Sequence, residues 1–189
     1  AADVSLDLSV TAHDDNELGE MRFGIQGGSF GDWVPVAGSA KLEIPRVDGP
    51  YTVMGQLRDR AGNLSPTFTD MITLDTAPPT SEVLPLVDVT VGLTADVCWQ
   101  GRDGTSGISA YEIEVRDGAH GSWTLWRSGT AASCATFEGD EGHTYYFRSR
   151  AQDNAGHWEG YPTSPDYDTY TTLATTAFNY RAYVPMVMR

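Results

Sequence analysis

The chain has 189 residues, of which 40% are hydrophobic and 20% charged, and its formal net charge is −14 at pH 7. This length has room for two domains of about 100 residues, each just large enough for its own core. The acidic residues are spread over both halves, which argues against nucleic acid or an anionic membrane as partner. No apolar run approaches the ~18 residues of a membrane span, so we expect no membrane insertion.

In chain order, the first signal is a repeat. The stretch YTVMGQLRDRAGN (51–63) matches YYFRSRAQDNAGH (145–157): each begins with an aromatic residue, alternates, and ends on Asp-x-Ala-Gly. Further matches lie upstream, with 4–14 aligning to 93–103 and 18–25 to 108–115. A self-similarity of roughly 90 residues is too long for a solenoid unit, and it predicts two related domains in tandem.

The elements predicted within each repeat are strands, because apolar or small residues recur at every second position. This pattern holds for Met21, Phe23 and Ile25, for Tyr51, Val53, Gly55 and Leu57, for Tyr111, Ile113 and Val115, and for Tyr145, Phe147, Ser149 and Ala151. No helical period survives a count. The fold class is therefore all-β, with two tandem antiparallel β-sandwiches.

The domain boundary is predicted at LDTAPPTS (74–81), where two prolines favour a short, semi-rigid spacer. The domains are then 1–76 and 77–173, followed by a C-terminal extension at 174–189. The Ala-Ala start suits either a mature terminus left after signal cleavage or a cloning boundary.

The second repeat carries a family resemblance. Trp99 sits on an early strand and Tyr145 begins a late one, in CWQGRDGTSGISAYEIEVRDG, SWTLW and FEGDEGHTYYFRSRAQDNAGHWEGYP. These strings resemble fibronectin type III modules of secreted bacterial proteins, in which a tyrosine hydroxyl bonds back to nearby backbone. The first repeat resembles a related bacterial Ig-like module, and YVPMVMR (183–189) resembles the tails of secreted proteins from Chloroflexus-like bacteria. The resemblance implies a fold that serves spacers, adhesive units and enzyme appendages alike.

Cys98 and Cys134 are the only two cysteines. Cys98 lies between inward Val97 and Trp99 and so faces outward, and a type III sandwich implies that its strand neighbours that of Cys134. We expect a disulfide worth roughly 4 kcal/mol by loop entropy, in an oxidising, extracytoplasmic setting. The alternative is two unpaired thiols.

Carboxylates and amides in the predicted turns are candidate calcium ligands, since calcium takes six to eight oxygens. They are Asp14, Asp15, Asn16, Asp59, Asp103 and Asp153. The alternative is that these residues favour turns by bonding their own backbone. We expect no other cofactor.

Several aromatic residues of the second domain form a candidate binding surface for sugar rings or a protein partner: Trp123, Trp126, Tyr146, Trp158 and Tyr161. Because Trp33 aligns with Trp123, packing within the module is the alternative. On the strands nearby, outward Glu112 and Glu114 are predicted to face Arg148 and Arg150 as solvated ion pairs.

No catalytic constellation is visible in the sequence. The four histidines fall on predicted loops, with no HExxH, no GxSxG and no Gly-rich phosphate loop. The sequence therefore predicts a protein that is not an enzyme.

The two ends of the chain are mismatched. The second domain has SEVLPLV (81–87) before its Trp99 strand, whereas the first begins directly on the equivalent of that strand. The extension alternates and would supply a donor strand through Phe178, Tyr180, Ala182, Val184 and Met186. Donation to the first domain of the next subunit would be heterologous and would build an open filament. Alternatively the tail folds back on its own chain or acts as a sorting signal, or the first strand was removed from the chain.

These features predict a non-catalytic structural or interaction protein of a bacterial cell surface. Its partners would be itself, another surface protein or a polysaccharide. The runner-up is an accessory spacer or carbohydrate-binding region of a secreted hydrolase.

Overall fold

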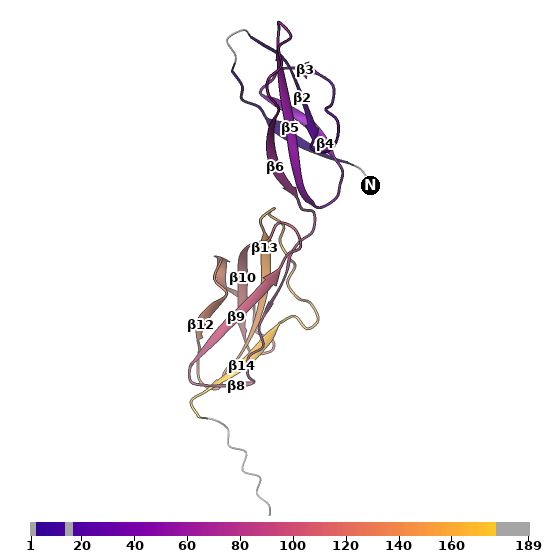
Figure 1. Cartoon of the computed structure of the whole chain (residues 1–189). Helices are drawn as coiled ribbons and strands as arrows, with labels where there is room; N and C mark the ends of the chain where they lie inside the picture. Colours follow the sequence, from indigo (N-terminus) through magenta and orange to yellow (C-terminus); the bar gives the residue numbers. More distant parts are fainter. Residues whose placement is uncertain (1–2, 14–16, 177–189) are drawn as a thin grey trace, which may run out of the picture. The chain divides into compact units, whose positions relative to one another are not determined.

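The structure is a computed structural model that describes residues 3–13 and 17–176. The chain divides into two compact units, Ala1–Thr76 and Ala77–Arg189, each of which is built from strands (Figure 1). Within the described ranges no helix is present, and accordingly none could cross a membrane. The prediction of an all-β chain is confirmed.

The first domain packs a two-stranded sheet against a four-stranded one, in the orders β1-β4 and β3-β2-β5-β6. Its strands are β1 (Val4–Ser9), β2 (Leu18–Ile25), β3 (Val34–Pro35), β4 (Ser39–Ile44), β5 (Gly49–Asp59) and β6 (Phe68–Leu74). The core is small, with Met21, Phe23 and Val53 as its buried centre. The inward residues of β1 around this centre are only half-buried.

The second domain has a three-stranded sheet, β12-β9-β7, and a five-stranded sheet, β11-β10-β13-β14-β8. Its strands are β7 (Thr80–Val83), β8 (Val89–Val91), β9 (Thr94–Arg102), β10 (Ile108–Asp117), β11 (Thr124–Thr130), β12 (Cys134–Glu138), β13 (Thr144–Asp153) and β14 (Thr169–Ala174). All neighbours are antiparallel except β8 and β14, which run parallel. Since β14 ends at Ala174, the first residue of the predicted extension belongs to the sandwich.

The second core is larger because aromatic side chains fill it. Trp99 and Phe147 are almost fully buried, beside Ile113 and Leu173. Tyr145 forms the expected corner, its hydroxyl accepting a hydrogen bond from the Asp140 backbone N–H at 3.0 Å. In the first domain the hydroxyl of Tyr51 also bonds back to nearby backbone, but as a donor: it lies 3.0 and 2.9 Å from the carbonyl oxygens of Pro45 and Val47.

The two sandwiches match residue by residue in one sheet. β1 pairs with β4 so that Ser9 lies opposite Ser39, and β9 pairs with β12 so that Cys98 lies opposite Cys134. The Val10 N–H donates to Gly38, and its counterpart Trp99 donates to Ser133. Because the two domains are equivalent here, the strands that flank β9 in the second domain can be compared with those that flank β1 in the first.

Candidate functional site

The predicted disulfide is present. Cys98 and Cys134 are direct cross-strand partners on β9 and β12, with their Cα atoms 4.0 Å apart. The flanking residues Val97 and Trp99 point into the core, so the bridge lies on the outer face, as the alternation predicted. A bridge between neighbouring strands fixes their register and closes a loop with a sequence separation of 36 residues.

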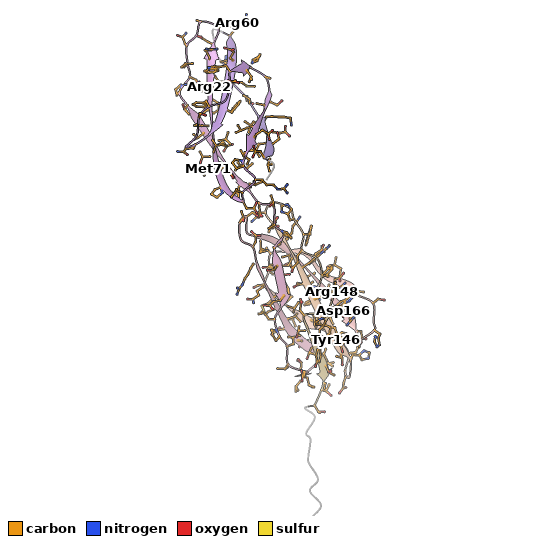
Figure 2. The ribbon with its side chains drawn as sticks, turned by 90° about the vertical axis from the view of Figure 1, so that its right-hand side faces the viewer. Arg22, Arg60, Met71, Tyr146, Arg148 and Asp166 are labelled. Atoms are coloured by element: carbon orange, nitrogen blue, oxygen red, sulfur yellow. A yellow bond between two sulfur atoms is a disulfide. The ribbon has the colours of Figure 1, made fainter. Side chains whose placement is uncertain are left out.

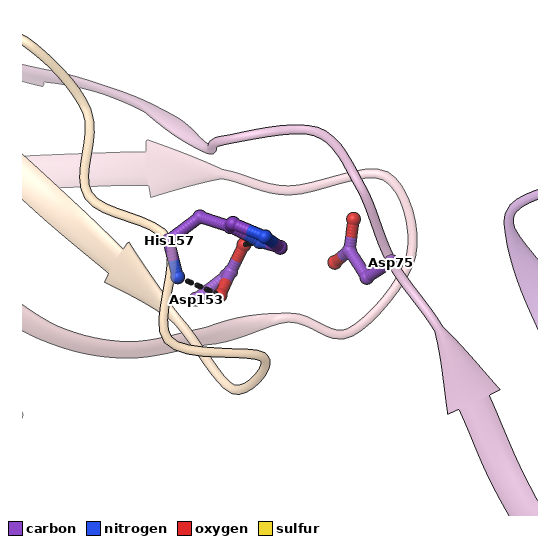
Figure 3. Close-up of side chains that lie close together, drawn as sticks. All are labelled: Asp75, Asp153 and His157. Atoms are coloured by element: carbon purple, nitrogen blue, oxygen red, sulfur yellow. Dashed lines mark hydrogen bonds and ion pairs between the residues drawn. The ribbon is translucent and has the colours of Figure 1, made fainter. Parts of the chain in front are cut away.

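The turn carboxylates are occupied by hydrogen bonds within their own turns. Asp59 accepts from the backbone and the side chain of Asn63, each at 2.7 Å. Asp153 accepts from the backbone N–H of His157 at 2.8 Å and lies 2.9 Å from its Nδ1 (Figure 3). Asp75, also drawn in that figure, belongs to the first domain.

These bonds explain the repeated Asp-x-Ala-Gly motif. Gly62 and Gly156 close the two turns with φ of +93° and +96°, a conformation that favours glycine. The hydrogen bonds from Asn63 also hold the pKa of Asp59 below its usual value. Turn chemistry therefore accounts for these residue types without an ion.

The remaining candidate calcium ligands divide in two groups. Asp103 accepts from the backbone N–H groups of Thr105 and Gly107, again a local turn. Among residues that the structure describes, neither Asp59 nor Asp103 belongs to a group of three acidic, histidine or cysteine side chains with ligand atoms within 4.8 Å. The other three candidates, Asp14, Asp15 and Asn16, lie outside the described residues. Calcium binding stays a prediction.

The predicted ion pairs across β10 and β13 are confirmed. Glu112 lies opposite Arg150 and Glu114 opposite Arg148, and each carboxylate is 2.6 Å from its guanidinium. The Arg148 and Glu114 side chains keep only 16% and 17% of their surface exposed. They are thus much less solvated than the prediction of a solvated pair assumed.

Aromatic rings cover these pairs and alternate with the arginines. In six of these contacts the guanidinium carbon lies 4.2–4.9 Å from the centroid of the ring. The resulting series, which we call the arginine–aromatic ladder, runs Trp158, Arg150, Tyr161, Arg148, Trp123, Arg116 and Tyr146. Cation–π contacts of this kind contribute about 0.5–2 kcal/mol each, more as they lose solvent.

Asp166 closes the ladder at one end. It accepts two hydrogen bonds from Arg116, at 2.7 and 3.0 Å, and one from the Trp123 indole at 3.3 Å. The bonds from Arg116 hold the pKa of Asp166 below its usual range. Within the ladder, burial raises the pKa of Tyr161 to about 12. Tyr146, Arg148 and Asp166 can be followed on the second domain in Figure 2.

Trp126 does not belong to this surface, which corrects the sequence prediction. Its ring packs into the core against Trp99, Phe137 and Phe147, at centroid distances of 6.2, 5.5 and 5.8 Å. Trp123 and Trp126 are three positions apart, and an odd spacing along extended chain sends side chains to opposite faces. The spacing of the two tryptophans therefore already indicated that Trp126 faces away from Trp123. Grouping the aromatic residues by type alone did not use that spacing.

The ladder bears on the predicted binding of sugar rings by the other aromatic candidates, because the arginines occupy positions against their rings. A sugar ring stacks on the face of an aromatic ring, and Trp123 and Tyr161 each already contact two guanidinium groups. The first domain has a shorter version, in which Arg22 and Arg58 both lie over Trp33, at 4.3 and 4.6 Å. The alignment of Trp33 with Trp123 thus reflects packing within each module.

The centre of the ladder gives a stability prediction. Arg148→Met should lower the free energy of unfolding of the second domain by about 1–3 kcal/mol, because Glu114 is left half-buried without its cation. Urea denaturation followed by tryptophan fluorescence measures this loss. The double variant Glu114→Gln/Arg148→Met should recover part of it, and Arg102→Met on the exposed end of β9 should stay within about 0.5 kcal/mol of the parent.

A second prediction concerns pH. His143 Nδ1 lies 2.7 Å from Asp117, and this hydrogen bond, with the charge of Asp117, raises the pKa of His143 above 6.5. The stabilisation is full below pH 6.5 and is lost as the pH rises through the folded-state pKa. An NMR titration of the imidazole should show the raised value, and Asp117→Asn should bring it back toward 6.5; an unchanged value would contradict the pairing.

The first domain has an open groove between β1 and β6. Among the described strands, β1 pairs only with β4, on one of its two edges. The counterpart of β1 in the second domain is β9, which has a partner on both edges, β12 and β7. The groove has a volume of about 600 Å³ and is lined mainly by apolar side chains, among them Leu6, Leu8, Val10, Phe23, Val53 and Phe68. On β6, Met71 is 78% exposed (Figure 2).

No protein-family model matches the sequence, and no curated protein matches it significantly. Among solved structures, the fibronectin(III)-like modules of Clostridium thermocellum CbhA superpose with a TM-score of 0.50 at 15% identity, covering 90% of this chain and 85% of that one. Two fibronectin type III domains of chicken tenascin match with a TM-score of 0.32 at 12% identity, covering 84% and 90%. A tetra-tandem repeat from the extending region of a large adhesion protein gives 0.37 at 20% identity, covering 83% and 43%.

The likeness to the CbhA modules shows the fold and, at this identity, nothing finer. The chain is a tandem of fibronectin type III-like β-sandwiches, as the resemblance implied. Modules of this kind and an intramolecular disulfide are typical of extracellular proteins.

Proposed function

We propose that this chain is a non-catalytic structural and interaction protein of a bacterial cell surface that assembles head to tail. The open groove of the first domain carries the proposal, since an apolar groove beside an unpaired strand edge favours strand addition. The donor would be the extension of a second copy. Its predicted donor residues, Phe178, Tyr180, Ala182, Val184 and Met186, lie outside the described residues.

Head-to-tail donation is a heterologous contact, because the groove and the donor are different parts of the chain. Such contacts generate an open polymer unless the rotation closes into a ring. The disulfide supports an oxidising environment. The disulfide and the arginine–aromatic ladder also both stiffen the second domain, which suits a structural role.

The test compares the full chain with a variant ending at Thr176, which keeps β14 whole. Light scattering and negative-stain microscopy should show polymers for the full chain and monomers for the shortened one. Polymers in both would overturn strand donation. Monomers in both would overturn assembly and favour the runner-up, an accessory region of a secreted hydrolase.

Calcium belongs to the same proposal. The experiment is repeated with millimolar calcium and with a chelator, so that a site formed by the turn carboxylates shows as a change in assembly or in melting temperature. Identical behaviour under both conditions would remove calcium from the proposal.

A further inference from the structure

The second domain shows how its own groove is filled. β7 pairs with β9, placing Val83 opposite Trp99, and the Leu84 N–H then donates to the Cys98 carbonyl at 2.8 Å. The chain crosses to the other sheet at Pro85. After the crossing, Leu86 packs against the core and donates its N–H to Thr169 Oγ1 at 2.9 Å.

The same segment then continues as β8, which runs parallel to β14. One stretch of chain with a proline at its crossing point therefore covers both open edges of the sandwich. In the first domain the corresponding edges are those of β1 and β6, which border the groove.

The first domain presents the matching half of each contact. Ser9 takes the position of Cys98, and Val10 that of Trp99. Because the Val10 N–H is directed at Gly38 on the β4 side, the carbonyl of Ser9 is directed at the edge of β1 with which no described strand pairs, as that of Cys98 is directed at Leu84. Val10 also fills much less space than Trp99, and it lines the groove.

The extension is similar in sequence to the covering segment. Tyr183-Val184-Pro185-Met186-Val187 aligns with Val83-Leu84-Pro85-Leu86-Val87, with the proline at the same place. The large and the small side chain of the facing pair change places between the two domains. Where Val83 faces Trp99 in the second domain, Tyr183 would face Val10 in the first, so one large and one small side chain meet in both cases.

We propose that residues 181–187 of one chain bind the groove of the first domain of a second copy in the register of residues 81–87. Tyr183 lies beside Val10, the Val184 N–H donates to the Ser9 carbonyl, and Met186 enters the cavity after the crossing at Pro185. This inference rests on the proposed head-to-tail assembly and names its contacts. In this register Tyr183 and Met186 face inward. The sequence pattern alone instead predicts that the even-numbered residues of the extension all face inward.

This register explains why a proline is tolerated in the donor. In an unbroken antiparallel strand with the even-numbered residues inward, residue 185 would face the β1 edge and would need an N–H, which proline lacks. At a crossing between two sheets no ladder hydrogen bond is required. Pro85 occupies such a crossing in the second domain, between β7 and β8.

A size exchange tests the register. Val10→Trp rebuilds the residue found at position 99 and should block Tyr183, so that polymers are lost while the first domain stays folded by circular dichroism. Val10→Trp/Tyr183→Val recreates the pair seen in the second domain and should restore assembly. Failure of the double variant to assemble, with both variants folded, would overturn the register.

A charge placed at residue 182 separates the two registers. Ala182 aligns with Glu82, an exposed residue that accepts a hydrogen bond from Gln100 at 2.7 Å. Ala182→Glu should therefore leave assembly intact, and Tyr183→Glu should abolish it. The opposite result would support the even-numbered set and overturn the register, while head-to-tail assembly would stand.

Crosslinking identifies whose groove is filled. Thr11 and Ala182 correspond to Gln100 and Glu82, which lie opposite each other. Mixed Thr11→Cys and Ala182→Cys chains should give disulfide-linked dimers on oxidation, and Arg181→Cys, one residue away, should give far fewer. If the chains still polymerise but give no crosslink, the register is overturned and head-to-tail assembly stands. A crosslink within a single chain that carries both Thr11→Cys and Ala182→Cys, and that runs as a monomer, would assign the groove to its own tail and overturn both proposals.

Discussion

Trp99→Ala should lower the free energy of unfolding of the second domain by about 3–5 kcal/mol, the usual cost of truncating a buried aromatic side chain. Trp99 is 1% exposed and contacts Trp126 edge to face, with ring centroids 6.2 Å apart. Its removal leaves a cavity in a core whose other members, such as Phe147 and Ile113, are also fully buried. Such a core has little freedom to collapse around the gap.

The matched control is Val10→Ala, at the equivalent position of the first domain. Val10 is half-buried at the edge of an existing groove, so the change should cost about 1 kcal/mol or less in the isolated chain. Urea denaturation resolves the two effects when the indole NMR signal of Trp33 reports on the first domain and that of Trp158 on the second. Equal losses at both positions would contradict the difference in packing between the two cores.

Much of the fold was predictable because it rests on a period of two. The alternation of Tyr145, Phe147 and Ser149 identifies a strand buried on one face, and β13 has that burial pattern. The same alternation predicted that Cys98 faces outward, and the resemblance to type III modules implied that its strand neighbours that of Cys134, where the disulfide lies. Local pattern and global fold agree in these places, which makes them readable from sequence.

The ladder could be predicted only in part. Alternation gave the pairs of Glu112 and Glu114 with arginines on β13, because cross-strand partners follow from register. Trp158 and Tyr161, in contrast, come from the loop after β13, where no period fixes the direction of a side chain. Their stacking on Arg150 depends on tertiary packing that a single sequence does not encode locally.

The parallel pairing of β8 with β14 was also beyond the sequence pattern. β8 has three residues, Val89–Val91, and a strand this short has too few positions to show a period. Its position nevertheless matters, since it shows that the segment around Pro85 covers two edges of the sandwich. This arrangement is the observation from which we propose a register for the YVPMV sequence of the extension.

Removing the disulfide should have an effect of similar size to Trp99→Ala. The Cys98→Ser/Cys134→Ser variant should lose up to about 4 kcal/mol of stability in the second domain, because the bridge closes a loop with a sequence separation of 36. The bridge lies on the outer face, so the serines meet solvent and leave the core intact. The expected loss comes mainly from the greater freedom of the unfolded chain.

The first domain offers the reverse experiment at the same register. Ser9 and Ser39 are opposed on β1 and β4 as the two cysteines are on β9 and β12. Ser9→Cys/Ser39→Cys should therefore oxidise without moving the backbone, and the first domain should gain stability with the second unchanged. The gain should be somewhat below 4 kcal/mol, because this bridge closes a loop of only about 30 residues and engineered bridges often carry strain. A bridge that forms but gives no gain would show that the native-state fit, and not loop closure, sets the contribution of Cys98–Cys134.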